Sequence, residues 1–278
     1  MSDAIDKLVS GTVLDNKGLC ATFLCGPQGG MRRSKRTSSL VIVSNHLRSI
    51  YDDRWIGDVL HYTGMGTVGD QRLDATQNRT LAKSQINGVA VHLFEVFMDK
   101  YYTYVGQVSL ADKPYQETQP DENQDLRKVW MFPLKLSSGE QVQVPEQVVR
   151  AIRKTKERQA RKLTDEDLLK RAKCASKRPG TRRSSVSAHD RSEWVSAYAK
   201  RSAAGTCQLC GEVAPFADKS GDPFLESHHV QWLSKGGEDS IENTVALCPN
   251  CHRRMHVLDL SKDKIALLQK IARRGERE

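Results

Sequence analysis

Two Cys-x-x-Cys pairs near the carboxyl end are the clearest chemical signal in this sequence. Cys207 and Cys210 form one pair, and Cys248 and Cys251 form the other. Each pair places two thiolates on one side of a tight turn, and two such turns can close a tetrahedral site of four sulfurs, which suits structural zinc. Because that site has no open coordination position, we expect the zinc to stabilise the fold and not to catalyse.

Four histidines are threaded between and after these cysteines. His228 and His229 are adjacent and follow a strand-like apolar segment, whereas His252 and His256 are four residues apart at the start of a predicted helix. Residues with this spacing lie on one helical face, so His252 and His256 can share a metal ion. A zinc-binding fold without catalysis, as in a transcription factor, is the alternative, but it has no need for the adjacent histidine pair.

The order of these residues resembles one nuclease family. Leu225-Glu226-Ser227-His228-His229-Val230 is followed by Gly236-Gly237, by Asn243, and by Leu247-Cys248-Pro249-Asn250-Cys251-His252 with His256. This block resembles the HNH, or ββα-metal, nuclease family over about residues 195–260. It is most similar to the zinc-stapled HNH module of McrA-type modification-dependent restriction endonucleases.

Chemistry and the family pattern together suggest roles for these side chains. Phosphodiester hydrolysis needs a deprotonated water and a cation that holds the phosphate and takes up charge. His229 is the candidate general base, because histidine titrates near neutral pH. The candidate ligands of one divalent ion (Mg²⁺, Mn²⁺, Co²⁺ or Ni²⁺) are His228, His252 and His256. The resemblance implies that Asn243 tethers the loop and helps to orient the base, and Glu226 and Arg253 are further candidates for supporting or phosphate contacts.

Charge and cysteine usage bound the function further. The chain has 278 residues and a net charge of +9, which favours an anionic partner such as nucleic acid. Its seven cysteines are an odd number, which argues against a disulfide framework and for a reducing compartment. We find no apolar run long enough to span a bilayer and no secretion signal. We therefore expect a cytoplasmic, nucleoid-associated bacterial protein that does not bind membranes.

Most of the positive charge lies in one segment. Residues 150–183 hold fourteen lysines and arginines against four acidic residues. Pro145 and the Thr164-x-x-Asp167 pattern predict the starts of two helices. This segment is predicted to contact DNA phosphates, with a solvated helix face as the alternative. The candidate phosphate contacts are Arg153, Lys154, Arg158, Arg161 and, in the nuclease block, Arg253.

The first part of the chain resembles a family of modified-base readers. Apolar segments at 41–43, 89–97 and 101–108 predict strands. Tyr51-Asp52-Asp53, followed by His61-Tyr62-Thr63-Gly64-Met65-Gly66, resembles the SRA (YDG) family over roughly residues 10–140. The resemblance implies that a modified cytosine is flipped out of the duplex into a pocket. Tyr51 and Tyr62 would stack on the base, Asp53 would accept from its exocyclic amine, and Thr63 would bond its edge. A strand–turn core without a base pocket is the alternative for these residues.

These observations predict an α+β protein with three segments. Residues 1–144 would form a mostly-β, SRA/PUA-like domain that binds modified DNA, residues 145–188 a basic helical linker, and residues 189–278 an HNH endonuclease domain with a four-cysteine zinc site. The predicted activity is a metal-dependent restriction endonuclease acting on double-stranded DNA that carries a modified, methylated cytosine. Cutting both strands would favour a homodimer. The alternatives are an HNH nuclease that reads another feature of DNA and a non-catalytic, zinc-stapled DNA-binding regulator.

Overall fold

The protein folds into two compact units, Met1–Val186 and Ser187–Glu278. The computed structural model describes residues 3–47, 50–137, 139–177, 180–185 and 191–275. Each unit has its own buried apolar core. Within the described residues, no helix is long and apolar enough to cross a membrane.

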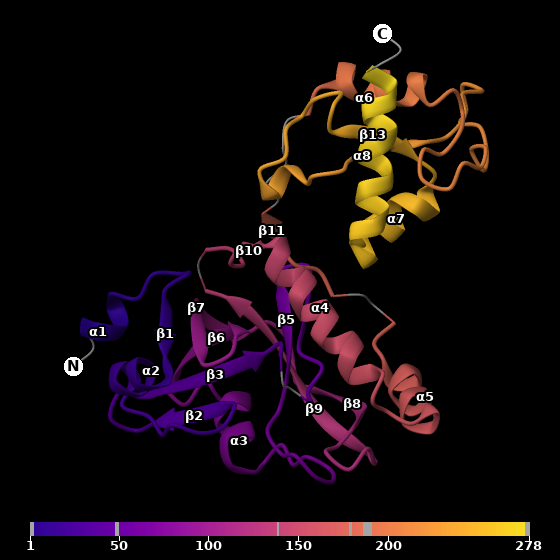
Figure 1. The fold of residues 1–278 in the computed structure, drawn as a ribbon. Helices are drawn as coiled ribbons and strands as arrows, with labels where there is room; N and C mark the ends of the chain where they lie inside the picture. Colours follow the sequence, from indigo (N-terminus) through magenta and orange to yellow (C-terminus); the bar gives the residue numbers. More distant parts are fainter. Residues whose placement is uncertain (1–2, 48–49, 138, 178–179, 186–190, 276–278) are drawn as a thin grey trace. The chain divides into compact units, whose positions relative to one another are not determined.

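A sheet of nine strands, counted over the described residues, forms the first unit (Figure 1). Its main path runs β2-β3-β6-β7-β9-β5-β4, while β1 pairs with β7 and β8 pairs with β9. The pairing of β3 with β6 is parallel and the other pairings in this sheet are antiparallel. The strands are β1 (Val13–Asp15), β2 (Met31–Ser34), β3 (Ser39–Asn45), β4 (Arg54–Ile56), β5 (Val59–Thr63), β6 (Ala90–Met98), β7 (Tyr101–Leu110), β8 (Tyr115–Pro120) and β9 (Leu126–Leu136). The mostly-β prediction is confirmed, and all three predicted strands are present.

The central strands β3 and β6 are apolar on both faces. Leu40 and Leu93 belong to one core, together with Leu81 of α3 (Thr76–Ala82). Val41 and Phe94 belong to a second core on the opposite face, where α2 (Asn16–Phe23) packs. Because successive side chains of a strand point to opposite faces, a strand covered on both sides requires a continuous apolar run. This explains why residues 89–97 lack the alternation of a half-exposed strand. The short helix α1 (Asp3–Asp6) precedes these elements.

The basic segment forms two helices that belong with the first unit. These are α4 (Glu146–Ala160) and α5 (Asp165–Cys174), and Thr164 caps α5 by accepting a hydrogen bond from the Asp167 N–H. The strand β10 (Val144–Pro145) pairs in parallel with β11 (Ser184–Ser185). The chain entering α4 and the chain leaving α5 therefore lie side by side, and the segment expected as a linker folds back on the sheet domain.

The second unit contains two antiparallel strands followed by a helix. The strands β12 (Glu226–His229) and β13 (Thr244–Leu247) pair, and α7 (Pro249–Leu258) follows at once. The helices α6 (Glu193–Ser202) and α8 (Ser261–Gly275) and a 3-10 turn (Leu233–Lys235) complete the unit. Val245, Leu247, Met255, Leu267 and Ile271 pack its core. This arrangement confirms the predicted ββα fold.

Candidate functional sites

The two Cys-x-x-Cys pairs meet in the second unit. Their four Sγ atoms lie within 4.8 Å of one another, at the start of α7 and in the turn after α6. Burial raises the pKa of Cys207, but hydrogen bonds from the backbone of Cys210 and Cys248 outweigh it and lower this pKa to about 7. A lowered pKa favours the thiolate that binds metal. Four convergent sulfurs fit a closed, tetrahedral zinc site.

Three of the predicted histidines form a second cluster. The ring nitrogens of His228 on β12 and of His252 and His256 on α7 lie within 4.8 Å of one another. The Nε2 atoms of His252 and His256 are 3.1 Å apart. His228 Nε2 is buried and has no hydrogen-bond partner among the described residues. A buried nitrogen left unbonded beside two other imidazoles fits a divalent cation held by all three rings.

The protonation of this cluster also suits a metal ion. Burial, helped by the charges of His252 and His256, lowers the pKa of His228 to about 3, and burial also lowers the pKa of His256. Both rings are therefore neutral at pH 7, which is the form that binds metal. His252 Nδ1 lies 2.6 Å from Glu226 Oε2, so Nδ1–H donates to Glu226 and Nε2 is directed to the cluster.

His229 shares a cavity of about 110 Å³ with the three clustered histidines. Its Nε2 lies 2.8 Å from Asp239 Oδ1, a partner that the sequence motif did not reveal. The pKa of Asp239 is lowered, first by the backbone N–H of Ser192 and then by His229, so this side chain is a carboxylate. His229 is thus held at the edge of the metal cluster without belonging to it.

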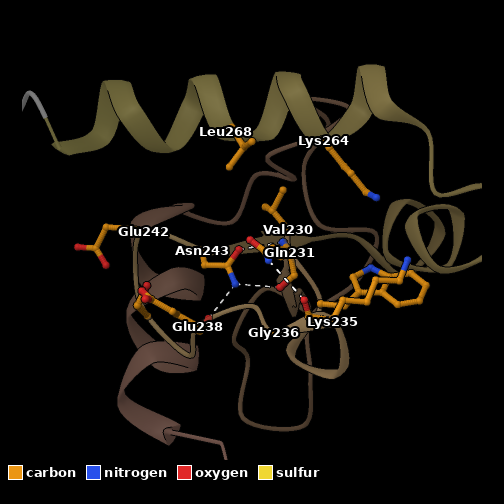
Figure 2. Close-up of a pocket in the computed structure, with 11 residues that line it drawn as sticks. Val230, Gln231, Lys235, Gly236, Glu238, Glu242, Asn243, Lys264 and Leu268 are labelled. Atoms are coloured by element: carbon orange, nitrogen blue, oxygen red, sulfur yellow. Dashed lines mark hydrogen bonds between the residues drawn. The ribbon is translucent and has the colours of Figure 1, made fainter.

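Asn243 ties together the loop between β12 and β13, as the family resemblance implied. Its Oδ1 accepts from the Gln231 N–H at 2.8 Å, and its Nδ2 donates to the carbonyls of Gln231 and Glu238 at 2.9 and 2.7 Å. Figure 2 shows these bonds beside a cavity of about 400 Å³ under α8. The turn also needs its glycines, because a Cβ on Gly237 would collide with the Gln231 carbonyl.

Two arginines lie near the cavity of the four histidines. Arg191 is exposed and lines the cavity of the four histidines, although the sequence pattern did not single it out. Its positive charge adds to the effect of burial in lowering the pKa of His228 and His256. Arg253, a predicted phosphate contact, is exposed on α7 between the two helical histidines.

The predicted base-pocket residues come together at β4 and β5. Asp53 Oδ1 accepts from the Thr63 N–H at 2.8 Å. Burial raises the pKa of Tyr62 well above its usual value, and the nearby Asp53 and Tyr51 raise it further. Tyr62 and Thr63 are buried, and the Tyr62 hydroxyl donates to the Gly30 carbonyl at 2.9 Å. Tyr51 is half-buried and donates to the Gly66 carbonyl at 3.0 Å.

Of the four predicted base-pocket residues, only Asp53 lines the cavity of about 360 Å³ that is also lined by α4 and by residues 180–182. Next to it, the fully buried Glu95 accepts hydrogen bonds from His46 at 2.8 Å, Trp55 at 3.1 Å and Arg182 at 2.8 Å. The sequence did not predict the ion pair between Glu95 and Arg182, because these residues are 87 positions apart. It did not predict the contribution of α4 to the cavity for the same reason. Burial raises the pKa of Asp53 to about 6, against the hydrogen bond from Thr63.

The predicted phosphate contacts of the basic segment face solvent. The apolar side of α4 supplies Val149 and Ile152 to the wall of the Asp53 cavity. The four predicted contacts Arg153, Lys154, Arg158 and Arg161 are all exposed, as are Arg150, Lys156 and Lys162 beside them. The helix therefore presents a positive face while its apolar stripe packs on the first unit.

Comparison with known families agrees with this division. A family model of the ScoMcrA-like SRA domain matches residues 11–157, more than half of the chain. The chain belongs to the ScoMcrA-like SRA domain family. A second model, of HNH endonucleases, matches residues 207–257, a range that includes both cysteine pairs, all four histidines and Asn243. The resemblances stated from the sequence are thereby confirmed.

Individual relatives of this ScoMcrA-like SRA chain match parts of it. The Type IV methyl-directed restriction enzyme EcoKMcrA of Escherichia coli (strain K12) is 46% identical over 78 residues, which are 28% of this chain and 28% of that protein. The Type IV phosphorothioation-dependent restriction endonuclease ScoMcrA aligns at a TM-score of 0.41 and 18% identity, covering 98% of this chain and 64% of that one. The modification-dependent TagI restriction endonuclease aligns at a TM-score of 0.38 and 22% identity, covering 91% and 79%.

Proposed function

We propose that this chain is a modification-dependent restriction endonuclease that hydrolyses DNA with one divalent metal ion. The observation that carries the proposal is the cluster of His228, His252 and His256 around an unbonded, buried nitrogen, with His229 on the same cavity. This cluster lies inside the range matched by the HNH endonuclease model. The names of EcoKMcrA, ScoMcrA and TagI, all restriction enzymes that respond to modified DNA, support the same reading.

The chain's own groups supply the other parts of the chemistry. A divalent ion held by the three histidines would bind the scissile phosphate and take up charge as the ester breaks. His229 removes a proton from water, because the ring keeps one nitrogen free when the other is bonded to Asp239. Asn243 fixes the loop that carries this base, and the exposed Arg253 binds a neighbouring phosphate.

The first unit would select the DNA. We propose that a modified cytosine, flipped from the duplex, enters the cavity lined by Asp53 and is bound there by Asp53, which the buried Thr63 holds through its backbone N–H. The basic face of α4 supplies non-specific attraction to the phosphates. A backbone-modified DNA is the second candidate substrate, because ScoMcrA is named as phosphorothioation-dependent.

Cleavage of matched duplexes tests both parts. Unmodified, cytosine-methylated and phosphorothioated DNA of one sequence would be incubated with zinc-loaded protein and Mg²⁺ or Mn²⁺. Selective cutting of methylated DNA, lost in His229→Ala and reduced in Asp53→Ala, is the expected result. If the protein cuts phosphorothioated DNA selectively and Asp53→Ala does not change this, the first unit recognises a modified backbone and not a flipped cytosine. Binding without cutting, identical in wild type and His229→Ala, would favour the zinc-stapled regulator. A homodimer on the DNA stays a prediction, which sedimentation of the complex would test.

A further inference from the structure

Asp239 uses both oxygens of its carboxylate at the nuclease cavity. Oδ1 lies 2.8 Å from His229 Nε2, and Oδ2 accepts a hydrogen bond from the Ser192 backbone N–H at 2.6 Å. The residue sits in the loop that Asn243 ties down, just after Gly236 and Gly237. No part of the sequence pattern used to predict the site includes it.

We propose that Asp239 is a positioning residue with two roles: it orients the general base His229, and it fixes the backbone that presents Arg191 to the scissile phosphate. The inference rests on the proposed nuclease function. It assigns to this chain a positioning residue and a phosphate-binding arginine that the motif does not contain.

The first role follows from the chemistry of imidazole. A neutral ring has one N–H donor and one acceptor nitrogen, and the hydrogen bond at one nitrogen sets which is which. Because Asp239 is a carboxylate, it can only accept, so His229 carries its hydrogen on Nε2. Nδ1 is then left with the lone pair that a general base requires. Without Asp239 the ring could rotate or exchange its hydrogen between the two nitrogens.

The second role follows from where Ser192 lies. Ser192 is the N-cap of α6, and its own side chain accepts from the Val195 N–H, so the helix start is held from both sides. Arg191 is the preceding residue and lines the cavity of the four histidines. Fixing the Ser192 N–H therefore limits where the Arg191 guanidinium can go. A guanidinium beside a metal-bound phosphate can bind its oxygens in a bidentate manner.

The two contacts need two acceptor oxygens, which makes a conservative substitution informative. Asparagine is close to aspartate in size but has one acceptor oxygen and one NH2 donor, so Asp239→Asn can keep the Ser192 N–H bond while its NH2 donates to His229 Nε2, which moves the ring hydrogen to Nδ1 and removes the lone pair of the base. Asp239→Ala removes both contacts. Glu242→Gln removes an exposed acidic charge three residues away and serves as the matched control.

The first measurement is steady-state cleavage of a duplex that the wild type cuts. General-base catalysis typically contributes about 10²- to 10⁴-fold to the rate, and Asp239 supports part of that contribution by orienting His229. We expect kcat to fall by about 10- to 100-fold in Asp239→Ala and by at least as much in Asp239→Asn, whose amide favours the tautomer without a lone pair on Nδ1, and we expect KM to rise in Asp239→Ala because Arg191 is released. Arg191→Ala should raise KM and lower kcat together, whereas Arg191→Lys should recover part of the loss. Glu242→Gln should behave as wild type. Unchanged kcat in Asp239→Ala, with zinc content and circular dichroism intact, would overturn the inference.

The second measurement does not depend on cleavage. Nitrogen-15 NMR of the zinc-loaded protein, without the catalytic ion, distinguishes the two imidazole tautomers, and His229→Ala identifies the His229 signals. We expect one tautomer, with hydrogen on Nε2, in wild type and Glu242→Gln, and a mixture in Asp239→Ala. A single, unchanged tautomer in Asp239→Ala would refute the positioning role. Tautomer mixing in a protein whose wild type cuts no DNA would instead uphold the contact and reject the nuclease.

Discussion

Replacing Arg182 with alanine should destabilise the first unit by about 3 kcal/mol. Its guanidinium bonds Glu95, which is fully buried. Burial by itself raises the pKa of Glu95, but the His46 hydrogen bond and the Arg182 charge outweigh it and lower the pKa from 4.5 to about 2. A lowering of that size corresponds to about 3 kcal/mol of stabilisation of the carboxylate, which His46 and Arg182 share. Removing one partner of a buried ion pair typically costs about 3–5 kcal/mol, which agrees.

The destabilisation should also depend on pH. Because the pKa of Glu95 is lower in the folded state, its stabilising contribution is complete above about pH 5 and is lost as the pH falls toward 2. The Arg182→Ala variant lacks much of that contribution at neutral pH. The difference in unfolding free energy between wild type and variant should therefore be largest near pH 7 and should narrow below pH 5.

Urea-dependent hydrogen exchange of peptides from β6 is the assay, because it reports on the first unit alone. The neighbouring Arg183 offers a matched control, since it pairs with Glu140 at the surface. Exposed pairs contribute at most about 1 kcal/mol, so Arg183→Ala should cost little. Two outcomes would refute the assignment of Arg182 as the counter-charge of Glu95. One is an equal, small loss of unfolding free energy in Arg182→Ala and Arg183→Ala. The other is a difference in unfolding free energy between wild type and Arg182→Ala that does not change with pH.

Three other predictions follow from the sites. Cys248→Ala should lose zinc and unfold the second unit, because zinc binding and folding are coupled. The control Cys174→Ala should keep both its zinc and its fold. Metal analysis measures the zinc content and circular dichroism measures the folding. Asp53→Asn should stabilise the first unit at pH 8 by up to about 2–3 kcal/mol, because the raised pKa of Asp53 makes its ionisation costly in the folded state. Denaturant titrations should show that this gain in unfolding free energy vanishes by pH 4. A gain that persists at pH 4 would contradict the argument from burial. Replacing the exposed Arg153, Lys154 and Arg158 with glutamine should flatten the salt dependence of DNA binding by about 2–3 in log–log slope, and an unchanged slope would make this helix face a solvated one.

Local patterns predicted that the four cysteines and the three histidines would cluster, because the spacing of these residues reflects the elements that carry them. The i, i+4 spacing of His252 and His256 requires a helix, and the strand before His228 sets that ring opposite them. The Thr164 cap and the strand at residues 89–97 were predictable for the same reason: each depends on neighbours within a few residues.

Contacts between distant segments were not predictable from this single sequence. Asp239 meets Ser192 across 47 residues, and Arg182 meets Glu95 across 87. Such pairs leave no periodicity, and a charged residue in a basic run is usually solvated. The position of α4 beside the sheet domain was not predictable for the same reason. The composition of residues 145–188 indicated a linker, but it could not show that Val149 and Ile152 of α4 face a cavity of the first unit.

The pairing of β10 with β11 brings together the two ends of the segment that contains α4 and α5. The strand that leads into these helices and the strand that leaves them are neighbours, so the helices form a side loop and not a spacer in series. Lengthening or shortening α5 should therefore leave the pairing of β10 with β11 intact.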